Sequence, residues 1–162
     1  MISIFARQQK QSVITSIRSQ KSSHWRNLPM INWQHRVLAV FIGLSGCFCV
    51  LFGAWLAHAG GHLSLEVVTR LETAHQYHIL HTLALLGLVI WRQQAKSRIL
   101  AASSWLMVAG MCGFSGSLYF KTLLMMPELG KMAPFGGVSL ALAWLCIAIY
   151  GVTGAATSQR IE

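Results

Sequence analysis

Four long apolar segments limit what this chain can fold into. They span residues 37–57, 74–91, 99–120 and 135–154, and none of them contains a charged residue. A helix of about 20 residues crosses the hydrocarbon core of a bilayer, whereas open β-structure cannot, because its edge amides have no partners in lipid. Since the connections between the segments are short, the sequence predicts an all-α, integral membrane four-helix bundle with up-down topology.

The composition excludes most other classes of protein. Charged residues make up 10% of the chain and hydrophobic residues 54%, whereas a soluble domain carries roughly 25% charged residues. The net charge of +9 is compatible with nucleic acid, but the basic residues lie between the apolar segments, as in membrane proteins, and we expect no nucleic-acid partner. The four cysteines lie within apolar segments without Cys-x-x-Cys spacing, so we interpret them as packing residues.

The first 36 residues differ in composition from the rest of the chain. Residues 1–36 hold six basic residues and no acidic residue, and they are rich in Ser and Gln. We predict a largely disordered or surface-lying basic tail, then a membrane domain at residues 37–155 and a short C-terminal tail at 156–162. An acid-poor N-terminus is typical of a mitochondrial transit peptide and equally of a cytoplasmic segment that rests on anionic lipid.

Basic residues beside the apolar segments predict the orientation of the chain. The two tails and the connection at 92–98 hold ten Lys and Arg residues, whereas the connections at 58–73 and 121–134 hold three. Because basic loops remain in the cytoplasm, we expect both termini to be cytoplasmic and the 58–73 connection to face the opposite side. We expect a bacterial inner membrane, or alternatively the mitochondrial inner membrane with the basic N-terminus as a targeting segment.

Small residues recur along the predicted helices. Such ladders let helix backbones approach closely, and packing rather than the hydrophobic effect drives helix association in lipid. The predicted helix-packing residues are Ser45, Cys49, Gly53, Ala57, Ala109, Gly113, Ser117, Gly136 and Gly137. The pattern indicates tight packing and is silent on chemistry.

Five of the seven histidines lie at one end of the predicted bundle. They are His58, His62, His75, His78 and His81. Neutral imidazoles with a nearby carboxylate suit zinc, copper or iron, and two histidines on facing helices can ligate haem. Alternatively, most of these side chains form hydrogen bonds with the backbone or with water. His81 lies nearly two turns inside its segment, where a polar group needs a partner and is a functional candidate by default.

A second polar group, made of two serines and a tyrosine, lies at the outer end of the third segment. Because His81 must find partners inside the bundle, we expect it to point toward His58 or toward this group. The candidate site for haem, a quinone or a metal consists of His58, Tyr77, His81, Ser115, Ser117 and Tyr119. We expect no catalytic residues, since the chain contains neither an Asp nor a Gly-x-Ser-x-Gly sequence.

Four short motifs occur in order along the apolar segments. They are Gly53-Ala54-Trp55-Leu56-Ala57-His58, Tyr77 with His81-Thr82-Leu83-Ala84-Leu85-Leu86-Gly87, Phe114-Ser115-Gly116-Ser117-Leu118-Tyr119, and Pro134, Gly136, Gly137 and Trp144. This order resembles the YgdD-like family of small four-helix membrane proteins, found in bacterial inner membranes and with an animal branch that looks mitochondrial. The resemblance implies the fold and the membrane location but no mechanism, because the family is one of unknown function. The sequence departs from the family pattern at Trp55-Leu56, where Phe-Gly is usual, and at Ala143, where a Gly usually precedes the tryptophan.

Three functional hypotheses follow from these observations. The first is a non-enzymatic bundle that associates with other membrane proteins, with copies of itself or with lipids. The second is a bundle that binds a cofactor, metal or quinone-like ligand at the outer His/Ser/Tyr cluster. Transport is the third, and it is disfavoured because no apolar segment contains an Asp, Glu, Lys or Arg to mark a path.

Overall fold

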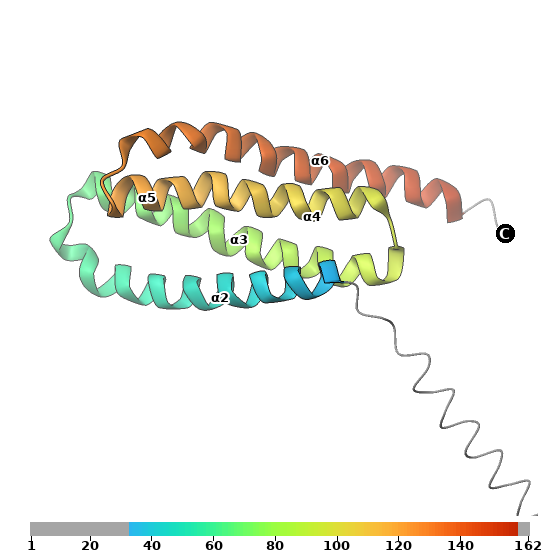
Figure 1. Cartoon of the computed structure of the whole chain (residues 1–162), viewed down its shortest axis with the longest axis horizontal. Coiled ribbons are helices and arrows are strands. Elements are labelled where there is room, and N and C mark those ends of the chain that lie inside the picture. The colour runs from blue at the N-terminus through green and yellow to red at the C-terminus, as the bar shows by residue number, and fades with distance from the viewer. Residues whose placement is uncertain (1–32, 159–162) are drawn as a thin grey trace, which may run out of the picture. The chain divides into compact units, whose positions relative to one another are not determined.

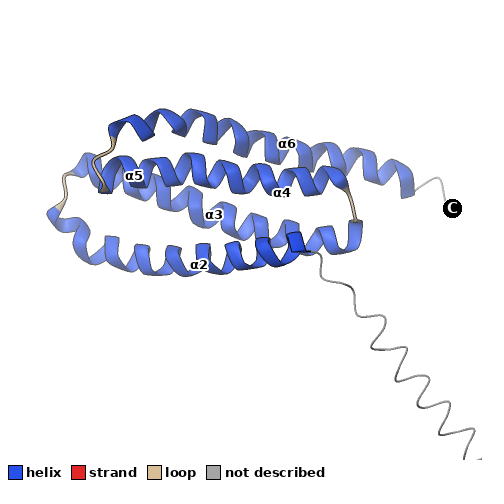
Figure 2. Cartoon of the chain, viewed as in Figure 1, coloured by secondary structure: helices blue, strands red, loops and turns tan. Residues whose placement is uncertain are grey.

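The structure is a computed structural model that describes residues 33–158, and every element in this range is helical (Figures 1 and 2). The elements are α2 (Trp33–Ala59), η1 (Gly60–His62), α3 (Leu65–Ala95), α4 (Arg98–Met111), η2 (Cys112–Gly116), α5 (Ser117–Leu123), η3 (Pro127–Met132) and α6 (Ala133–Ser158). The tail predicted at residues 1–36 lies outside the described residues except for its last four, with which α2 begins. Residues from Gln34 onward belong to one compact unit.

Four helical rods make up this unit, because α4, η2 and α5 form one continuous rod. Figure 1 shows that successive rods run in opposite directions, with α6 beside the α4–α5 rod. At one end of the bundle, α2 and α4 begin and α3 and α6 end. Contacts of Arg92 with Gln34 and of Trp91 with Tyr150 lie at this end. We name this the Arg92 end, and the opposite end, which holds η1 and η3, the η3 end. The predicted all-α four-helix bundle is confirmed.

Three of the four rods have the length and apolarity needed to cross a membrane. These candidate spans are Trp33–His58, Arg98–Leu123 and Pro127–Thr153. The helix α3 is long enough, at 31 residues, but it is less apolar than the other rods, because it carries three histidines within the predicted span. The membrane crossing of α3 therefore remains a prediction.

The outer surface of the bundle is apolar. On α6, large apolar side chains are exposed at spacings of three and four residues, which places them on one helix face. They are Phe135, Val138, Leu142, Leu145, Ile149 and Val152. Since a helix on the surface of a soluble protein carries polar and charged residues on its outer face, this surface is suited to contact with lipid.

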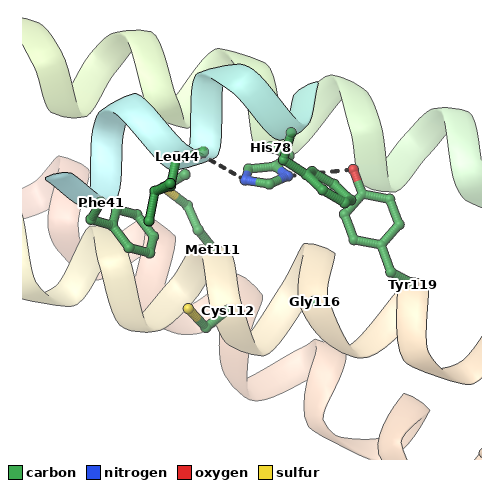
Figure 3. A pocket seen from close by; sticks show the side chains of 9 residues that line it. Phe41, Leu44, His78, Met111, Cys112, Gly116 and Tyr119 are labelled. Atoms are coloured by element: carbon green, nitrogen blue, oxygen red, sulfur yellow. Dashed lines mark hydrogen bonds between the residues drawn. The ribbon is translucent and has the colours of Figure 1, made fainter. Parts of the chain in front are cut away.

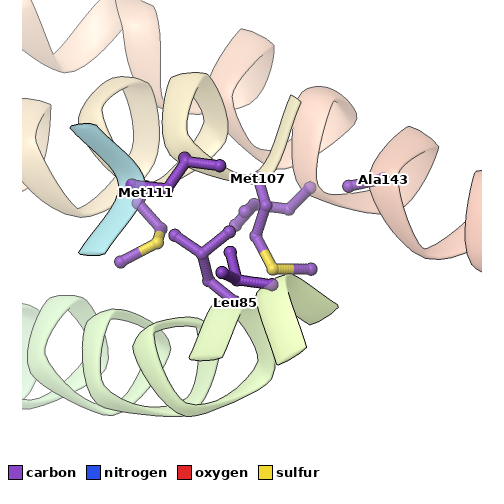
Figure 4. Packing of buried hydrophobic residues seen from close by; sticks show 7 residues of the cluster. Leu85, Met107, Met111 and Ala143 are labelled. Atoms are coloured by element: carbon purple, nitrogen blue, oxygen red, sulfur yellow. The ribbon is translucent and has the colours of Figure 1, made fainter. Parts of the chain in front are cut away.

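Two apolar clusters fill the interior. The first joins all four rods and consists of Leu38, Leu85, Val89, Met107, Met111, Leu140 and Ala143 (Figure 4). The second joins α2, α3 and α5 and consists of Phe52, Leu56, Leu71, Ala74 and Tyr119. Two residues that depart from the family motifs therefore pack in the core, since Leu56 is buried in one cluster and Ala143 in the other.

The helices α4 and α6 make the closest backbone approach in the bundle. A Cβ added at Gly110 would lie 2.6 Å from the Leu140 side chain and 2.9 Å from the Leu140 backbone nitrogen. A Cβ added at Gly136 would overlap the backbone of Phe114, and one at Gly113 would lie 3.1 Å from the Gly136 Cα atom. We name Gly110, Gly113 and Gly136 the glycine seam, because their lack of side chains allows this approach.

The predicted helix-packing residues divide into two groups. The buried or closely packed group contains Ser45, Cys49, Gly53, Gly113, Ser117 and Gly136. By contrast, Ala57 and Ala109 are exposed, and a Cβ at Gly137 would only reach ordinary contact with the Phe114 ring, at 3.8 Å. The third segment therefore turns Gly110, rather than the neighbouring Ala109, toward α6.

The helix α2 packs on α3 through side chains rather than through backbone. A Cβ added at Gly53 would lie 2.9 Å from Nε2 of His75, so the imidazole occupies the space that the glycine leaves. Ser45 likewise forms hydrogen bonds with two side chains of α3, which are described below. Because no interlocked backbone draws α2 inward, α2 stands further from its neighbours than α6 does.

The glycine seam leads to a prediction about stability. We expect Gly136→Ala to destabilise the bundle by about 1–3 kcal/mol, the usual cost of overpacking, because the added methyl group overlaps the Phe114 backbone. Gly87→Ala in α3 is the matched control, since no atom lies within 4 Å of a Cβ added there, and alanine raises helix propensity by up to about 1 kcal/mol. Thermal unfolding of the detergent-purified variants measures both effects. Equal unfolding midpoints for the two variants would show that close packing at the glycine seam does not stabilise the bundle.

Candidate functional site

A chain of hydrogen bonds links α2, α3 and α5. Nε2 of His78 lies 2.8 Å from Ser45 Oγ, and Ser45 Oγ lies 2.6 Å from Thr82 Oγ1. Thr82 donates its hydroxyl hydrogen to the carbonyl oxygen of His78 at 2.8 Å. At the other side of the ring, the Tyr119 hydroxyl lies 3.5 Å from His78 Nδ1. His78 and Thr82 face α2 together because they lie four residues apart on α3.

The hydroxyl hydrogens determine the direction of this chain. Each hydroxyl carries one hydrogen, and the hydrogen of Thr82 goes to the His78 carbonyl oxygen. Thr82 must therefore accept from Ser45, and Ser45 must accept from the Nε2–H group of His78. Nδ1 then carries the lone pair, and the Tyr119 hydroxyl donates to it. This last contact is the weakest of the chain, since 3.5 Å is longer than a typical hydrogen bond from a hydroxyl donor.

A cavity of about 340 Å³ lies beside the chain of hydrogen bonds, between α2, α3 and the α4–α5 rod. Its lining consists of Phe41, Leu44, Ser45, Phe48, His78, Met111, Cys112, Gly116 and Tyr119 (Figure 3). Leu44, Phe48 and Cys112 are exposed, so the cavity opens on the outer surface of the bundle. It therefore combines an apolar interior with one polar region, formed by Ser45, His78 and Tyr119.

The element η2 forms one wall of this cavity and is a single π-helical turn. Such turns inside α-helices occur frequently at functional sites. The Phe-Ser-Gly-Ser-Leu-Tyr motif begins within this turn, and its Gly116 and Tyr119 both line the cavity. Ser115 is buried, and within residues 33–158 its hydroxyl has no hydrogen-bond partner.

His81 joins α3 to α6. Its side chain is 4% exposed, and its Nε2 accepts a hydrogen bond from the indole N–H of Trp144 at 3.2 Å. Because an indole only donates, Nδ1 carries the proton and donates to the Tyr77 carbonyl oxygen at 2.7 Å. The expectation that His81 points toward His58 or toward the Ser/Tyr cluster is wrong, because the ring turns to α6, where Trp144 supplies the donor.

The five clustered histidines do not converge on one point. His58 and His62 are exposed at the η3 end, His75 and His78 contact α2, and His81 contacts α6. In the part of the chain that the structure describes, no three His, Cys, Asp or Glu side chains come together. The five histidines that were candidates for a metal site are therefore not assembled into one.

Of the other candidate residues, only Tyr119 lines the cavity. The ring of Tyr77 stacks on His81 instead, with 5.8 Å between the ring centroids. Ser117 donates to the Phe114 carbonyl oxygen within its own rod at 2.9 Å. The structure therefore does not bring the residues of the candidate site together: Tyr119 lines the cavity, His81 and Tyr77 stack at the contact with α6, and His58 is exposed at the η3 end.

Two hydrogen-bonding partners, Thr82 and Trp144, were not among the predicted site residues. Thr82 could have been found from its four-residue spacing from His78, which places both on one helix face. Trp144 could have been found as a donor, since it is a motif residue whose indole N–H needs an acceptor in lipid. No sequence signal indicated which histidine each would contact, because the rotation of each helix is fixed by packing.

The central part of the chain matches the model of a known family. Residues 52–137, more than half of the chain, match the family described as "Protein of unknown function (DUF423)". The chain belongs to the DUF423 family. The matched range contains His78, Tyr119 and the π-helical turn, and the predicted resemblance to YgdD-like proteins is confirmed by the relatives.

Several curated membrane proteins are similar to this DUF423 member. A UPF0382 membrane protein of Haemophilus influenzae is 34% identical over 68% of this chain and 88% of its own length. YwdK of Bacillus subtilis is 31% identical over 72% of this chain and 97% of its own length. The inner membrane protein YgdD of Escherichia coli K12 is 33% identical over 67% of this chain and 84% of its own length. No solved structure matches the chain.

These similarities establish a multi-pass membrane protein, embedded in the lipid bilayer. The apolar face of α6 agrees with this, and so does the apolar rim of the cavity. The apolar rim of the cavity is therefore suited to contact with lipid.

The contact of His81 with Trp144 leads to a second prediction. Trp144→Phe removes the indole N–H and leaves Nε2 of His81 without a donor, so we expect a loss of about 1–3 kcal/mol of stability. His81→Leu in the Trp144→Phe background removes the unpaired acceptor and should recover part of this loss. Thermal unfolding of the single and double variants gives the coupling energy. A coupling energy near zero would show that the hydrogen bond does not hold α6 to α3.

Proposed function

We propose that this DUF423 member is a non-enzymatic membrane protein that binds a lipid-soluble small molecule in the cavity. The observation that carries this proposal is the position of the Tyr119 hydroxyl and His78 Nδ1 at the polar region of an otherwise apolar cavity that opens on the outer surface of the bundle. A ligand enters such a cavity from the bilayer with its apolar part in contact with the walls. One oxygen of its headgroup then meets the two polar atoms.

A quinone or quinol fits this combination of groups best. A quinone carbonyl oxygen accepts a hydrogen bond from the Tyr119 hydroxyl. This hydroxyl is free to turn to the ligand because its contact with His78 is long and weak. A quinol hydroxyl donates to Nδ1 of His78 and accepts from Tyr119. The aromatic rings of Phe41 and Phe48, which line the same cavity, offer faces for the quinone ring.

The direction of the hydrogen bonds supports binding rather than catalysis. In a nucleophilic Ser/His pair, the imidazole accepts the serine hydrogen as a base. Here Nε2 of His78 donates to Ser45, and the Ser45 hydrogen is directed to Thr82. His81 has both ring nitrogens engaged. We infer that neither histidine activates a hydroxyl group.

We infer that both termini of the chain face the cytoplasm. At the Arg92 end, the described basic residues are Arg36, Arg92, Lys96 and Arg98. Arg70, Lys121 and Lys131 lie in the half of the bundle at the η3 end. Over the whole sequence, the two tails and the 92–98 connection hold ten Lys and Arg residues, whereas the other two connections hold three. Because basic residues are retained on the cytoplasmic side, this distribution supports a cytoplasmic Arg92 end in a bacterial inner membrane.

Cysteine labelling tests this orientation. In a variant in which the four native cysteines are replaced, we expect Ser64→Cys at the η3 end to react with a membrane-impermeant maleimide in intact cells. Gln94→Cys at the Arg92 end is the matched site, and it should react only after the cytoplasmic face is exposed, since both residues are exposed in the bundle. The reverse labelling pattern would overturn the orientation.

Binding of a decyl-substituted benzoquinone tests the ligand proposal. We expect it to stabilise the detergent-purified protein against thermal unfolding in a saturable manner. Tyr119→Phe should weaken its affinity by about tenfold, because one hydrogen bond contributes about 1–1.5 kcal/mol. Tyr77→Phe is the matched control, because its hydroxyl does not line the cavity, and it should leave the affinity unchanged.

Three results would overturn the ligand proposal. One is the absence of saturable benzoquinone binding to the unmodified protein. Another is equal affinity in Tyr119→Phe and in the unmodified protein, which would place the compound elsewhere on the apolar surface. The third is an equal loss of affinity in Tyr119→Phe and Tyr77→Phe, which would count against it in the same way.

A further inference from the structure

The Arg92 end of the bundle carries unneutralised positive charge. At the η3 end, Arg70 pairs with Glu66 and Lys131 pairs with Glu128. At the Arg92 end, no acidic residue lies within the described range to form such a pair. Among the described residues, the basic side chains of this end therefore have no ion-pair partner.

Arg92 is the most constrained of these basic residues. Its side chain is 7% exposed, although Arg36, Lys96 and Arg98 at the same end are exposed. Its Nη2 donates to Gln34 Oε1 at 3.3 Å, whereas Nη1 has no hydrogen-bond partner within residues 33–158. A buried guanidinium is costly unless it is paired. The neutral amide of Gln34 does not balance the charge, and the N–H groups of Nη1 have no acceptor within residues 33–158.

Two aromatic residues indicate the depth of Arg92 in the bilayer. Trp91 of α3 and Tyr150 of α6 pack edge to face, with 5.3 Å between their ring centroids, and Trp91 is 40% exposed. Tryptophan and tyrosine are enriched where the hydrocarbon core meets the headgroups. Since Arg92 follows Trp91 directly, its guanidinium lies at the level of the lipid phosphates.

We propose that Arg92 binds the phosphate group of an anionic phospholipid, between the start of α2 and the end of α3. A phosphodiester presents two oxygens, which match the paired N–H groups of a guanidinium. Basic sites between transmembrane helices on the cytoplasmic side bind anionic headgroups in this manner. The exposed Arg36, Lys96 and Arg98 add long-range attraction for a negatively charged headgroup. This site is separate from the cavity at His78 and does not depend on the proposed ligand there.

Lipid retention by the full chain tests the proposal. The protein, extracted in a mild detergent, is mixed with equal amounts of dioleoyl phosphatidylglycerol and dioleoyl phosphatidylcholine, and native mass spectrometry reports which lipid remains bound. We expect one phosphatidylglycerol to remain bound in preference to phosphatidylcholine. Arg92→Gln should reduce this retention by about tenfold, whereas Arg98→Gln, at an exposed position of the same end, should change it less than about twofold.

A second variant and a second measurement separate binding from folding. Arg92→Lys keeps the charge but loses the paired N–H groups, so it should retain phosphatidylglycerol to an intermediate degree. Phosphatidylglycerol should raise the thermal unfolding midpoint of the unmodified protein and not that of Arg92→Gln.

Millimolar inorganic phosphate should not displace the lipid. Displacement by phosphate would show that the site takes a free anion instead. Equal retention of the two lipids by the unmodified protein, or equal effects of Arg92→Gln and Arg98→Gln, would overturn the proposal.

Discussion

Hydrogen bonding between the rods holds this lipid-facing bundle in one arrangement. Lipid supplies neither donors nor acceptors, so polar side chains inside the bundle depend on partners within the protein. The Ser45 and Thr82 hydroxyls connect α2 to α3, and the Trp144 indole connects α6 to α3. Ser103 and Ser139 donate across α4 and α6 to carbonyl oxygens, each at 2.8 Å. These contacts are directional, so they determine the rotation of each rod as well as its neighbours.

The two sides of the bundle pack by different means, and the cavity results from this difference. The glycine seam brings α4 and α6 into backbone contact and leaves no room between them. On the opposite side, α2 meets the imidazole and hydroxyl groups of α3, which hold the helices apart. The space that remains between α2 and the α4–α5 rod is the cavity lined by Tyr119 and the π-helical turn. A contact made through side chains thus leaves an opening, whereas the backbone contact at the glycine seam leaves none.

The sequence predicted the number and order of the helices, because bilayer thickness sets the length of each charge-free segment. The fourth helix was predicted at residues 135–154 and spans Ala133–Ser158. The second extends further than predicted, over Leu65–Ala95 instead of 74–91, because its polar ends lie beyond the apolar pattern. The partner of His81 could not be predicted, since a shift of one residue rotates a helix face by about 100°. The same rotation explains why Gly110, rather than Ala109, meets α6.

His78 and His81 lie three residues apart on α3, yet their partners require the proton on opposite ring nitrogens. Both rings are neutral, but the hydrogen is on Nε2 in His78 and on Nδ1 in His81. The two imidazoles therefore differ in their nitrogen magnetic resonance spectra. His78 reports on α2 and α5, and His81 reports on α6. Separation of α2 from the bundle would alter the spectrum of the first ring and leave that of the second intact. The helix α3 thus carries two spectroscopic reporters, each specific for a different neighbour.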